Sequence, residues 1–361
     1  MLYRLILALR HLLFDKGWKK SYTASVPTVC VGNITAGGTG KTPHTEMILR
    51  TLLNSDEWAY ANLAMLSRGY KRRSRGFQTV TRDGTARAYG DEPLQIAKKF
   101  PSVHVAVDKN RVEGCRQLAE GGGAAEGMET AFPKAELIVL DDAFQYRRLR
   151  ASVNIVLIDY NRPVHKDHLL PWGHLRDLPS RLKAADIVIV TKCPLYMDEW
   201  EKGKWTSALS LRSDQALFFT TLSYAPMEPV FEEADSRYTY AQRLILFTGI
   251  AKDGPLRSFL SDKYKVIKRF SFPDHHRYTR GDVRKLMGAV RDCPIACVAT
   301  TEKDAQRIRD VRKVPEELKA RLFYVPVEVA FLSDEDRRRF DELLLRLLRE
   351  RQSAREMEVA D

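Results

Sequence analysis

The sequence predicts an α/β protein whose mostly parallel sheet is flanked by helices. Three continuous apolar runs, at 137–140, 153–158 and 187–190, lack the alternation of a half-exposed strand, so we expect strands buried on both faces. Segments with helical spacing separate such runs, as parallel strands require. The chain has 361 residues, which suffices for two domains, and its apolar and charged contents of 44% and 29% are ordinary for a globular protein.

The first strand of this sheet leads into the strongest motif of the chain. A short apolar run at 29–31 precedes a glycine-rich turn and a segment with helical spacing. This order is typical of a P-loop, whose backbone N–H groups surround phosphate oxygens. The residues that we expect to bind nucleotide phosphates are Thr35, Ala36, Gly37, Gly38, Thr39, Gly40, Lys41 and Thr42. In such loops the lysine reaches the β- and γ-phosphates and the hydroxyl binds Mg²⁺.

One position departs from the usual G-x-x-x-x-G-K-[ST] pattern, because Thr35 stands where the first glycine is expected. The alternative is a glycine-rich turn before an ordinary helix. The preceding strand and the Lys41–Thr42 pair favour the P-loop.

The rest of the first domain alternates between strands and helices. The run 77–80, followed by a D-G turn, predicts a hairpin. The other predicted elements are a strand at 63–66 that leads into a basic loop, a helix at 91–100, a strand at 103–107, a helix at 110–118 and a surface loop at 120–127.

A Pro- and acid-rich stretch at 223–238 predicts the boundary between two domains. We expect an N-terminal helix over 1–25, a P-loop domain over 26–225 and a smaller α/β domain over 226–361. The predicted elements of the last domain are strands at 244–248, 265–267, 296–299 and 322–325 and a charged amphipathic helix at 334–357.

The N-terminal segment mixes apolar and basic residues. One helical face collects Leu2, Leu5, Ile6, Leu9, Leu12 and Leu13, and Trp18 and two lysines follow. This pattern fits a helix that lies in a membrane interface. The alternative is an amphipathic helix packed on the protein's own core. No stretch approaches the 18 apolar residues of a membrane-spanning helix.

The charge balance and the cysteines narrow the class of protein. A net charge of +12 indicates an anionic partner: a nucleotide, a nucleic acid or an anionic membrane surface. The five cysteines have no matching ligand pair nearby, which favours buried, reduced thiols over a zinc site.

Two acids follow the apolar run at 137–140. An Asp at the carboxyl end of a parallel strand beside a P-loop can hold Mg²⁺ or its waters, which makes Asp142 a metal candidate and Gln145 a polar neighbour. The alternative for Asp141 and Asp142 is a turn or a helix cap.

Three further motifs carry reactive side chains. Asp91, in Y-G-D-E-P, begins a helix, and its spacing alone favours a cap, although it could serve as a base. His275 follows an aspartate in F-P-D-H-H-R-Y, where the alternative to proton transfer is a solvated loop. Arg176 and Asp177, in P-W-G-H-L-R-D, suit a phosphoryl group and a metal respectively, or else form a surface ion pair.

Taken in order, the motifs resemble one known family. They are V-G-N-I-T-A-G-G-T-G-K-T-P, L-S-R-G-Y, G-D-E-P, D-K-N-R, L-D-D-A-F-Q, L-P-W-G-x-L-R, D-H-H-x-Y and T-x-K-D. Together they resemble the tetraacyldisaccharide 4′-kinase family of the lipid A pathway, in which the displaced P-loop glycine also occurs.

The resemblance implies an ATP- and Mg²⁺-dependent kinase with a P-loop-NTPase-like domain. Its acceptor would be the 4′-hydroxyl of an acylated glucosamine disaccharide 1-phosphate. The enzyme would work at the cytoplasmic face of the bacterial inner membrane as a peripheral, monotopic protein, with the N-terminal helix touching lipid.

The resemblance also assigns roles. It makes Asp91 the base and His275 its partner, against the cap that spacing favours, and it places Lys41 and Arg176 at the phosphoryl group. The residues implied near the metal are Thr42, Asp142, Gln145 and Asp177, and those expected at the substrate are Asn33, Arg68 and Arg111. Asp177 stands where the family pattern commonly has Glu, and Tyr146 where it commonly has His.

Two rival functions remain open at this point. A P-loop GTPase or ATPase of the metallochaperone or motor type shares the loop and the acidic strand end, but V-T-K-C-P at 190–194 is only a partial match to a guanine-binding N-K-x-D. A basic nucleic-acid- or membrane-binding module would rest on K-R-R-S-R alone, so we expect no nucleic-acid partner.

Overall fold

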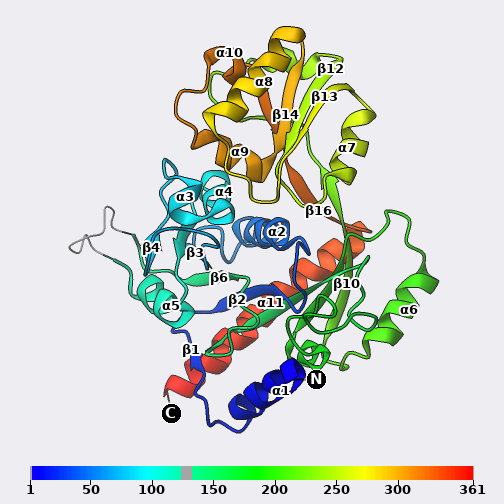
Figure 1. Ribbon diagram of the computed structural model, residues 1–361. Coiled ribbons are helices and arrows are strands. Elements are labelled where there is room, and N and C mark those ends of the chain that lie inside the picture. Colours follow the sequence, from blue (N-terminus) through cyan, green and yellow to red (C-terminus); the bar gives the residue numbers. More distant parts are fainter. Residues whose placement is uncertain (1, 123–131, 361) are drawn as a thin grey trace.

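The computed structural model describes residues 2–122 and 132–360 of the chain (Figure 1). Part of the predicted surface loop, 123–127, lies outside these residues. The strands are β1 Tyr22–Thr23, β2 Thr28–Asn33, β3 Leu63–Ser67, β4 Gln78–Thr79, β5 His104–Val107, β6 Leu137–Asp141, β7 Leu149–Arg150, β8 Val153–Asp159, β9 Ile187–Thr191, β10 Ala216–Tyr224, β11 Glu228–Pro229, β12 Arg243–Thr248, β13 Lys265–Ser271, β14 Cys297–Thr301, β15 Leu322–Val325 and β16 Val327–Phe331.

Helices fill most of the connections between these strands. They are α1 Leu2–Asp15, α2 Lys41–Leu53, α3 Ala86–Tyr89, α4 Asp91–Lys99, α5 Arg111–Glu120, α6 Glu199–Leu209, α7 Gly254–Ser261, α8 Arg280–Asp292, α9 Glu302–Arg309, α10 Glu316–Lys319 and α11 Asp334–Ala360, with 3₁₀ turns η1 Pro179–Ala184 and η2 Ser236–Tyr240.

The larger sheet has nine strands in the order β16-β10-β9-β8-β2-β6-β3-β5-β4. All neighbouring strands run parallel except the two edge pairs, β16 with β10 and β4 with β5. Apolar side chains of α2, α4 and α11 cover one face, and those of α5 and α6 cover the other. The predicted fold class is therefore confirmed, and the uninterrupted apolar runs are strands covered from both sides.

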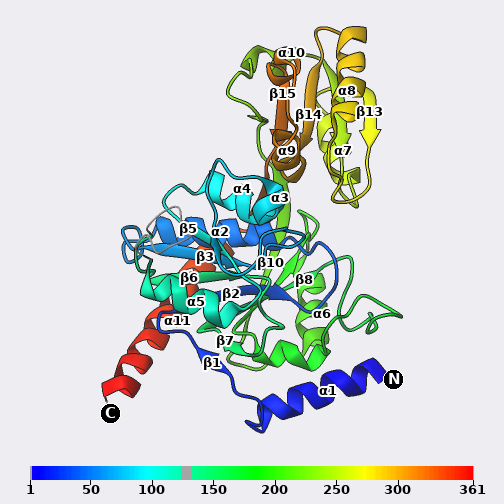
Figure 2. The ribbon, with the colours of Figure 1, turned by 60° about the vertical axis from the view of Figure 1, so that its left-hand side comes forward.

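The smaller sheet has five strands, β11-β15-β14-β12-β13, covered by α8, α9 and α10 on one face and by α7 on the other. It forms one end of the molecule, and α1 lies at the other end (Figure 1). The last strand and helix, which we assigned to the second domain, lie instead on the larger sheet: β16 pairs with β10, and Phe340 and Leu344 of α11 join its core. Figure 2 shows the C-terminal end of α11 projecting from the large-sheet part of the molecule, far from the small sheet.

Two other sequence expectations need correction. The predicted hairpin at 77–80 is wrong, because β4 pairs with the distant β5 and the residues after its turn form α3, which Thr85 caps. The segment 216–224, where the predicted linker begins, is the long strand β10. All five cysteines are buried and free of disulfides, as expected. Among the residues described, no helix combines the length and apolarity that crossing a bilayer requires.

Candidate active site

The carboxyl ends of the parallel strands meet at one edge of the large sheet, where open α/β folds bind ligands. The predicted phosphate loop joins β2 to α2 at this edge. Gly40 caps α2 with φ of +87°, a left-handed conformation that residues with a Cβ rarely adopt. The N-terminus of α2 thereby faces the loop, and its dipole favours phosphate there.

His44, on the second turn of α2, was missed by sequence reasoning although it fastens this loop. Its Nδ1 lies 2.7 Å from the carbonyl oxygen of Gly40, and its Nε2 lies 3.0 Å from the hydroxyl of Thr220. A carbonyl only accepts, so Nδ1 carries the proton and Nε2 accepts from Thr220. Burial lowers the pKa of His44 to about 4, so the ring is neutral near pH 7. No sequence motif singles out His44, because its partner Thr220 lies 176 residues further on.

Four predicted residues gather beside the loop. Arg176 donates to both carboxylate oxygens of Asp142, and its Nη2 lies 2.6 Å from Oδ1 of Asn33. Lys41 Nζ lies 3.7 Å from Oδ1 of Asp142. Burial lowers the pKa of Lys41. Burial would raise the pKa of Asp142, but the charges of Lys41 and Arg176 outweigh it and hold that pKa below its ordinary value. The carboxylate is thus ionised between two cations.

Asp141 lies in a different environment from its neighbour. Its Oδ2 accepts from the Ser67 hydroxyl at 3.1 Å, whereas its buried Oδ1 has no partner among the described residues. Burial and the nearby charges of Glu92 and Asp142 raise its pKa to about 6. A buried carboxylate oxygen without a partner is costly unless a cation satisfies it.

These oxygen groups fit a hard cation. Asp141 ends β6 and Asp142 follows it, and the Thr42 hydroxyl lies in the first turn of the neighbouring helix α2. Within residues 2–122 and 132–360, no three His, Cys, Asp or Glu side chains are grouped as a metal site. Magnesium commonly uses one or two carboxylates together with substrate phosphates and water, so this donor set suits it.

Asp91 and His275 come together where α4 packs against the small-sheet region. Asp91 is the first residue of α4, and Oδ2 of its carboxylate lies 3.3 Å from Nδ1 of His275, 184 residues further on. Gly90 before it has φ of +99°, so the chain turns sharply into the helix. Burial would raise the pKa of Asp91, but hydrogen bonds to His275 and Arg307 and the Arg307 charge lower it below its ordinary value. Asp91 is therefore held as a carboxylate.

Arg307 of α9 is a second residue that sequence reasoning missed. Its Nε and Nη2 lie 2.8 and 2.5 Å from Oδ2 of Asp91, and Nη2 lies 3.1 Å from Nδ1 of His275. The motif T-x-K-D singled out the start of α9, but Arg307 lies three residues beyond it.

Ion pairs join the same two elements around this contact. Lys303 of α9 lies 2.6 Å from Glu92 of α4. Lys99 of α4 lies 2.7 Å from Glu46 of α2 and 3.1 Å from Glu302 of α9. The charge of Glu92 also acts on Lys41. Glu92 thus connects the phosphate loop electrostatically to the Asp91 contact.

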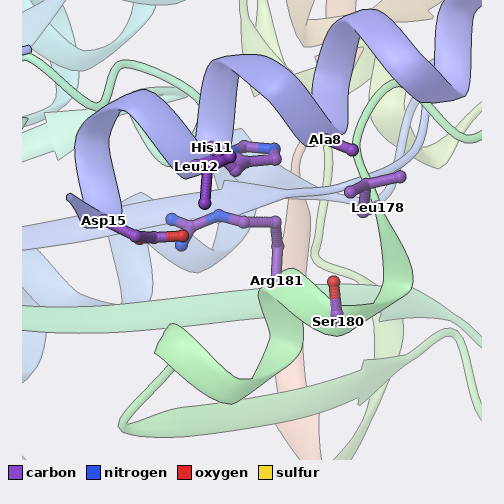
Figure 3. Close-up of a pocket in the computed structure, with 7 residues that line it drawn as sticks. All are labelled: Ala8, His11, Leu12, Asp15, Leu178, Ser180 and Arg181. Carbon is purple, nitrogen blue, oxygen red and sulfur yellow. The ribbon is translucent and has the colours of Figure 1, made fainter. Parts of the chain in front are cut away.

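Asp177 is turned towards α1 and η1. Oδ1 of its buried carboxylate accepts from the Leu178 N–H at 2.8 Å and lies 2.6 Å from Nε2 of His11, while Oδ2 has no hydrogen-bond partner among the described residues but lies 4.0 Å from Nε of the Arg181 cation. The shorter acid is thus bound to α1. Figure 3 shows His11 beside a cavity of about 380 Å³ between α1 and η1, lined also by Arg181.

The remaining predicted residues differ in burial and in their hydrogen-bond partners. Arg111 is buried, with Nη1 donating to the carbonyl oxygen of Asp108 at 3.0 Å. Arg68 is exposed, and no hydrogen bond or ion pair of its side chain is found in the described part of the chain. The Gln145 amide donates to the backbone carbonyl of Asn33 and so ties the loop after β6 to the end of β2.

Comparison with known proteins gives concordant matches. Residues 1–349 match the family model described as tetraacyldisaccharide-1-P 4′-kinase. The tetraacyldisaccharide 4′-kinase of Phocaeicola vulgatus is 39% identical, covering 91% of this chain and 87% of that protein. The enzyme of the same name from Parabacteroides distasonis is 36% identical, covering 96% and 92%. A crystal structure of LpxK from Aquifex aeolicus in complex with ATP superposes with a TM-score of 0.71 at 26% identity, covering 96% of each chain.

Proposed function

The chain belongs to the tetraacyldisaccharide 4′-kinase family, and from this premise we propose how its residues carry out phosphoryl transfer. It is an ATP-binding kinase of lipid A biosynthesis that phosphorylates the 4′ position of a tetraacyldisaccharide 1-phosphate. The family sequence motifs therefore predicted the enzyme correctly, and the rival GTPase or motor function is not supported.

The observation that carries the mechanism is the contact of Asp91 with His275 beside the phosphate loop. In the proposed reaction, Asp91 accepts the proton of the sugar 4′-hydroxyl while the hydroxyl oxygen attacks the γ-phosphorus of ATP. The bond from that phosphorus to the bridging oxygen breaks, and ADP leaves. His275 orients the carboxylate and stabilises the proton as it arrives.

Lys41 and Arg176 hold the charge that spreads over the γ-phosphoryl oxygens. Both already surround the Asp142 carboxylate, which occupies an anionic position beside the loop. Positioned cations in a partly buried site stabilise a phosphoryl transition state without reorganisation. The backbone of residues 35–40 and the start of α2 would bind the β- and γ-phosphates.

Magnesium is part of the proposal. Thr42, Asp142 and Asp141 are the side chains that would hold it, and Asp141 supplies the buried oxygen that has no partner. Gln145 and Asp177 are less suited to hold the ion. The Gln145 amide donates to the Asn33 carbonyl, and the Asp177 carboxylate binds His11. When bound, the ion would neutralise phosphate charge and align the γ-phosphoryl group.

Recognition of the acceptor and of the membrane completes the proposal. Exposed Arg68 suits the substrate 1-phosphate. Arg111, which we also expected at the substrate, is buried and donates to the Asp108 carbonyl, so it supports its own loop. On α1, Leu2, Leu5, Ile6, Leu9 and Leu12 are exposed, which favours a membrane-interface helix over one packed on the core. We propose that the enzyme binds the membrane peripherally through α1, on the cytoplasmic face of the inner membrane that the family resemblance implies.

The membrane proposal is tested by vesicle flotation. Replacing Leu5 and Leu9 with Ser should lower binding to anionic phospholipid vesicles about 10-fold or more, since each buried leucine contributes up to about 3 kcal/mol. Leu195→Ser is a matched control, because Leu195 and Leu5 are both 66% exposed. Equal binding of the two variants would contradict the role of α1.

The chemical proposal is tested by supplying γ-labelled ATP and tetraacyldisaccharide 1-phosphate to the protein. We expect the label on the 4′ oxygen, located by phosphorus–proton correlation in the purified product. Transfer to another hydroxyl, or release of inorganic phosphate without lipid product, would contradict it.

A further inference from the structure

Arg307 has an unusual set of partners for a residue that the reaction above does not use. It lies on α9 of the smaller sheet, with only 5% of its side chain exposed. Its Nη1 donates to the Gly249 carbonyl at 3.0 Å and to Asp304 at 2.9 Å, which fixes the guanidinium on its own side. The remaining donors, Nε and Nη2, point across the junction to Oδ2 of Asp91.

All hydrogen bonds to the Asp91 carboxylate found in the described residues end on one oxygen. His275 and both donors of Arg307 contact Oδ2, and none contacts Oδ1. The side chain of Asp91 is also 15% exposed. One oxygen is therefore held while the other is available.

We propose that Arg307 is a positioning residue for the base, because its guanidinium holds Oδ2 of Asp91 and leaves Oδ1 for the acceptor hydroxyl. The arrangement exists only while α9 lies against α4. Docking of the small sheet would thus orient the base at the same moment as it brings His275 to Asp91. This inference rests on the proposed base role of Asp91.

The charged groups that face Asp91 come from three segments. Arg307 and Lys303 lie on α9, His275 lies after β13, and Glu92 is next to Asp91 on α4. Asp304 pairs with the other side of Arg307, and the charge of Asp91 acts on Asp310 at the end of α9. Removal of Arg307 takes away the cation in direct contact with Asp91, so the pKa of Asp91 should rise.

The experiment is the pH profile of kcat/KM for Arg307→Ala with ATP and tetraacyldisaccharide 1-phosphate. The acid limb should move to higher pH by about 1–3 units, the range that an adjacent arginine imposes on an aspartate. The loss of activity should therefore be greater at pH 6 than at pH 8. Arg309→Ala is the matched control, because Arg309 contacts Val230 and Gln306 on its own side and should keep the wild-type profile.

A second variant covers the case in which Arg307→Ala does not fold. Arg307→Lys keeps the charge but not the two-donor geometry, so kcat should fall about 10-fold while the acid limb moves less than in the alanine variant. An unmoved acid limb in folded Arg307→Ala, or wild-type kcat in Arg307→Lys, would overturn the inference. Asp91→Asn separates the two proposals: wild-type turnover there would overturn the base role itself.

Discussion

Lys41, Asp142 and Arg176 are held by the larger sheet and its loops, whereas Asp91 and His275 meet where α4 packs against the small-sheet region. Lys41 begins α2, Asp142 directly follows β6, and Arg176 lies in a loop whose backbone bonds to Ile34. The second group joins α4 to a loop of the smaller sheet, and α9 adds Arg307 to it. We infer that the nucleotide half of the site is preformed, while the base half depends on how the small sheet docks.

This contrast predicts the largest effect for Lys41→Ala. It removes the cation that we propose to bind phosphate in the preformed half, so kcat should fall by about 10³-fold or more. Arg50→Ala is the control, because Arg50 lies on the same helix and pairs with Glu46 and Glu328. Steady-state transfer rates measure both variants. A loss of less than about 10-fold in Lys41→Ala would remove the phosphate loop from the mechanism.

His44 gives a test of the preformed half that depends on pH. Its pKa is about 4 when folded and 6.5 when unfolded, so the unfolded chain binds the proton more readily between these values. The stabilisation is complete above about pH 6.5 and is lost as pH falls towards 4. At pH 5 the free energy of unfolding should be about 2 kcal/mol lower than at pH 7.5 from this group alone.

Urea unfolding of His44→Gln measures that contribution. The variant should lose about 2 kcal/mol less than the wild type between pH 7.5 and pH 5. His168→Gln, at an exposed histidine, should keep the wild-type difference. Identical pH dependence of His44→Gln and the wild type would show that the ring does not fasten the loop as a neutral group.

The smallest expected effect concerns docking of the small sheet. Lys303→Ala breaks the 2.6 Å ion pair with Glu92, a partly exposed contact of about 1 kcal/mol. We expect kcat to fall about 5-fold with ATP affinity unchanged, because only the base half is loosened. Lys319→Ala is the control, since Lys319 pairs with Glu233 and Glu316 within the small-sheet region. A loss of ATP affinity as large as the loss of kcat would contradict the distinction between the nucleotide half and the base half of the site.

The same contrast explains what the sequence could predict. The buried parallel strands and the phosphate loop depend on residues close together in the chain, and continuous apolar runs identify them. The strand β16 was missed because its apolar residues, at 329–332, are few and directly precede a helix, and its partner β10 lies about 100 residues earlier. Tertiary pairing, not local preference, makes it a strand.

Within the site, spacing alone assigned Asp91 to a helix cap, and only the family motifs placed it at the reaction. The contact that gives Asp91 its chemistry spans 184 residues to His275 and 216 to Arg307. No local pattern indicates such contacts. Asp177 illustrates the reverse case, because its residue type suited a metal while its actual partner, His11, lies 166 residues away on α1.

The most direct test of the account is Asp91→Asn, which keeps the size of the side chain and removes its basicity. ATP affinity, measured by calorimetry, should stay within about twofold of the wild type. The rate of phosphate transfer to the 4′-hydroxyl at saturating substrates should fall by about 10²–10⁴-fold, the usual contribution of a general base. Turnover close to the wild type, with the phosphate still on the 4′ oxygen, would contradict the assignment of Asp91 as the base.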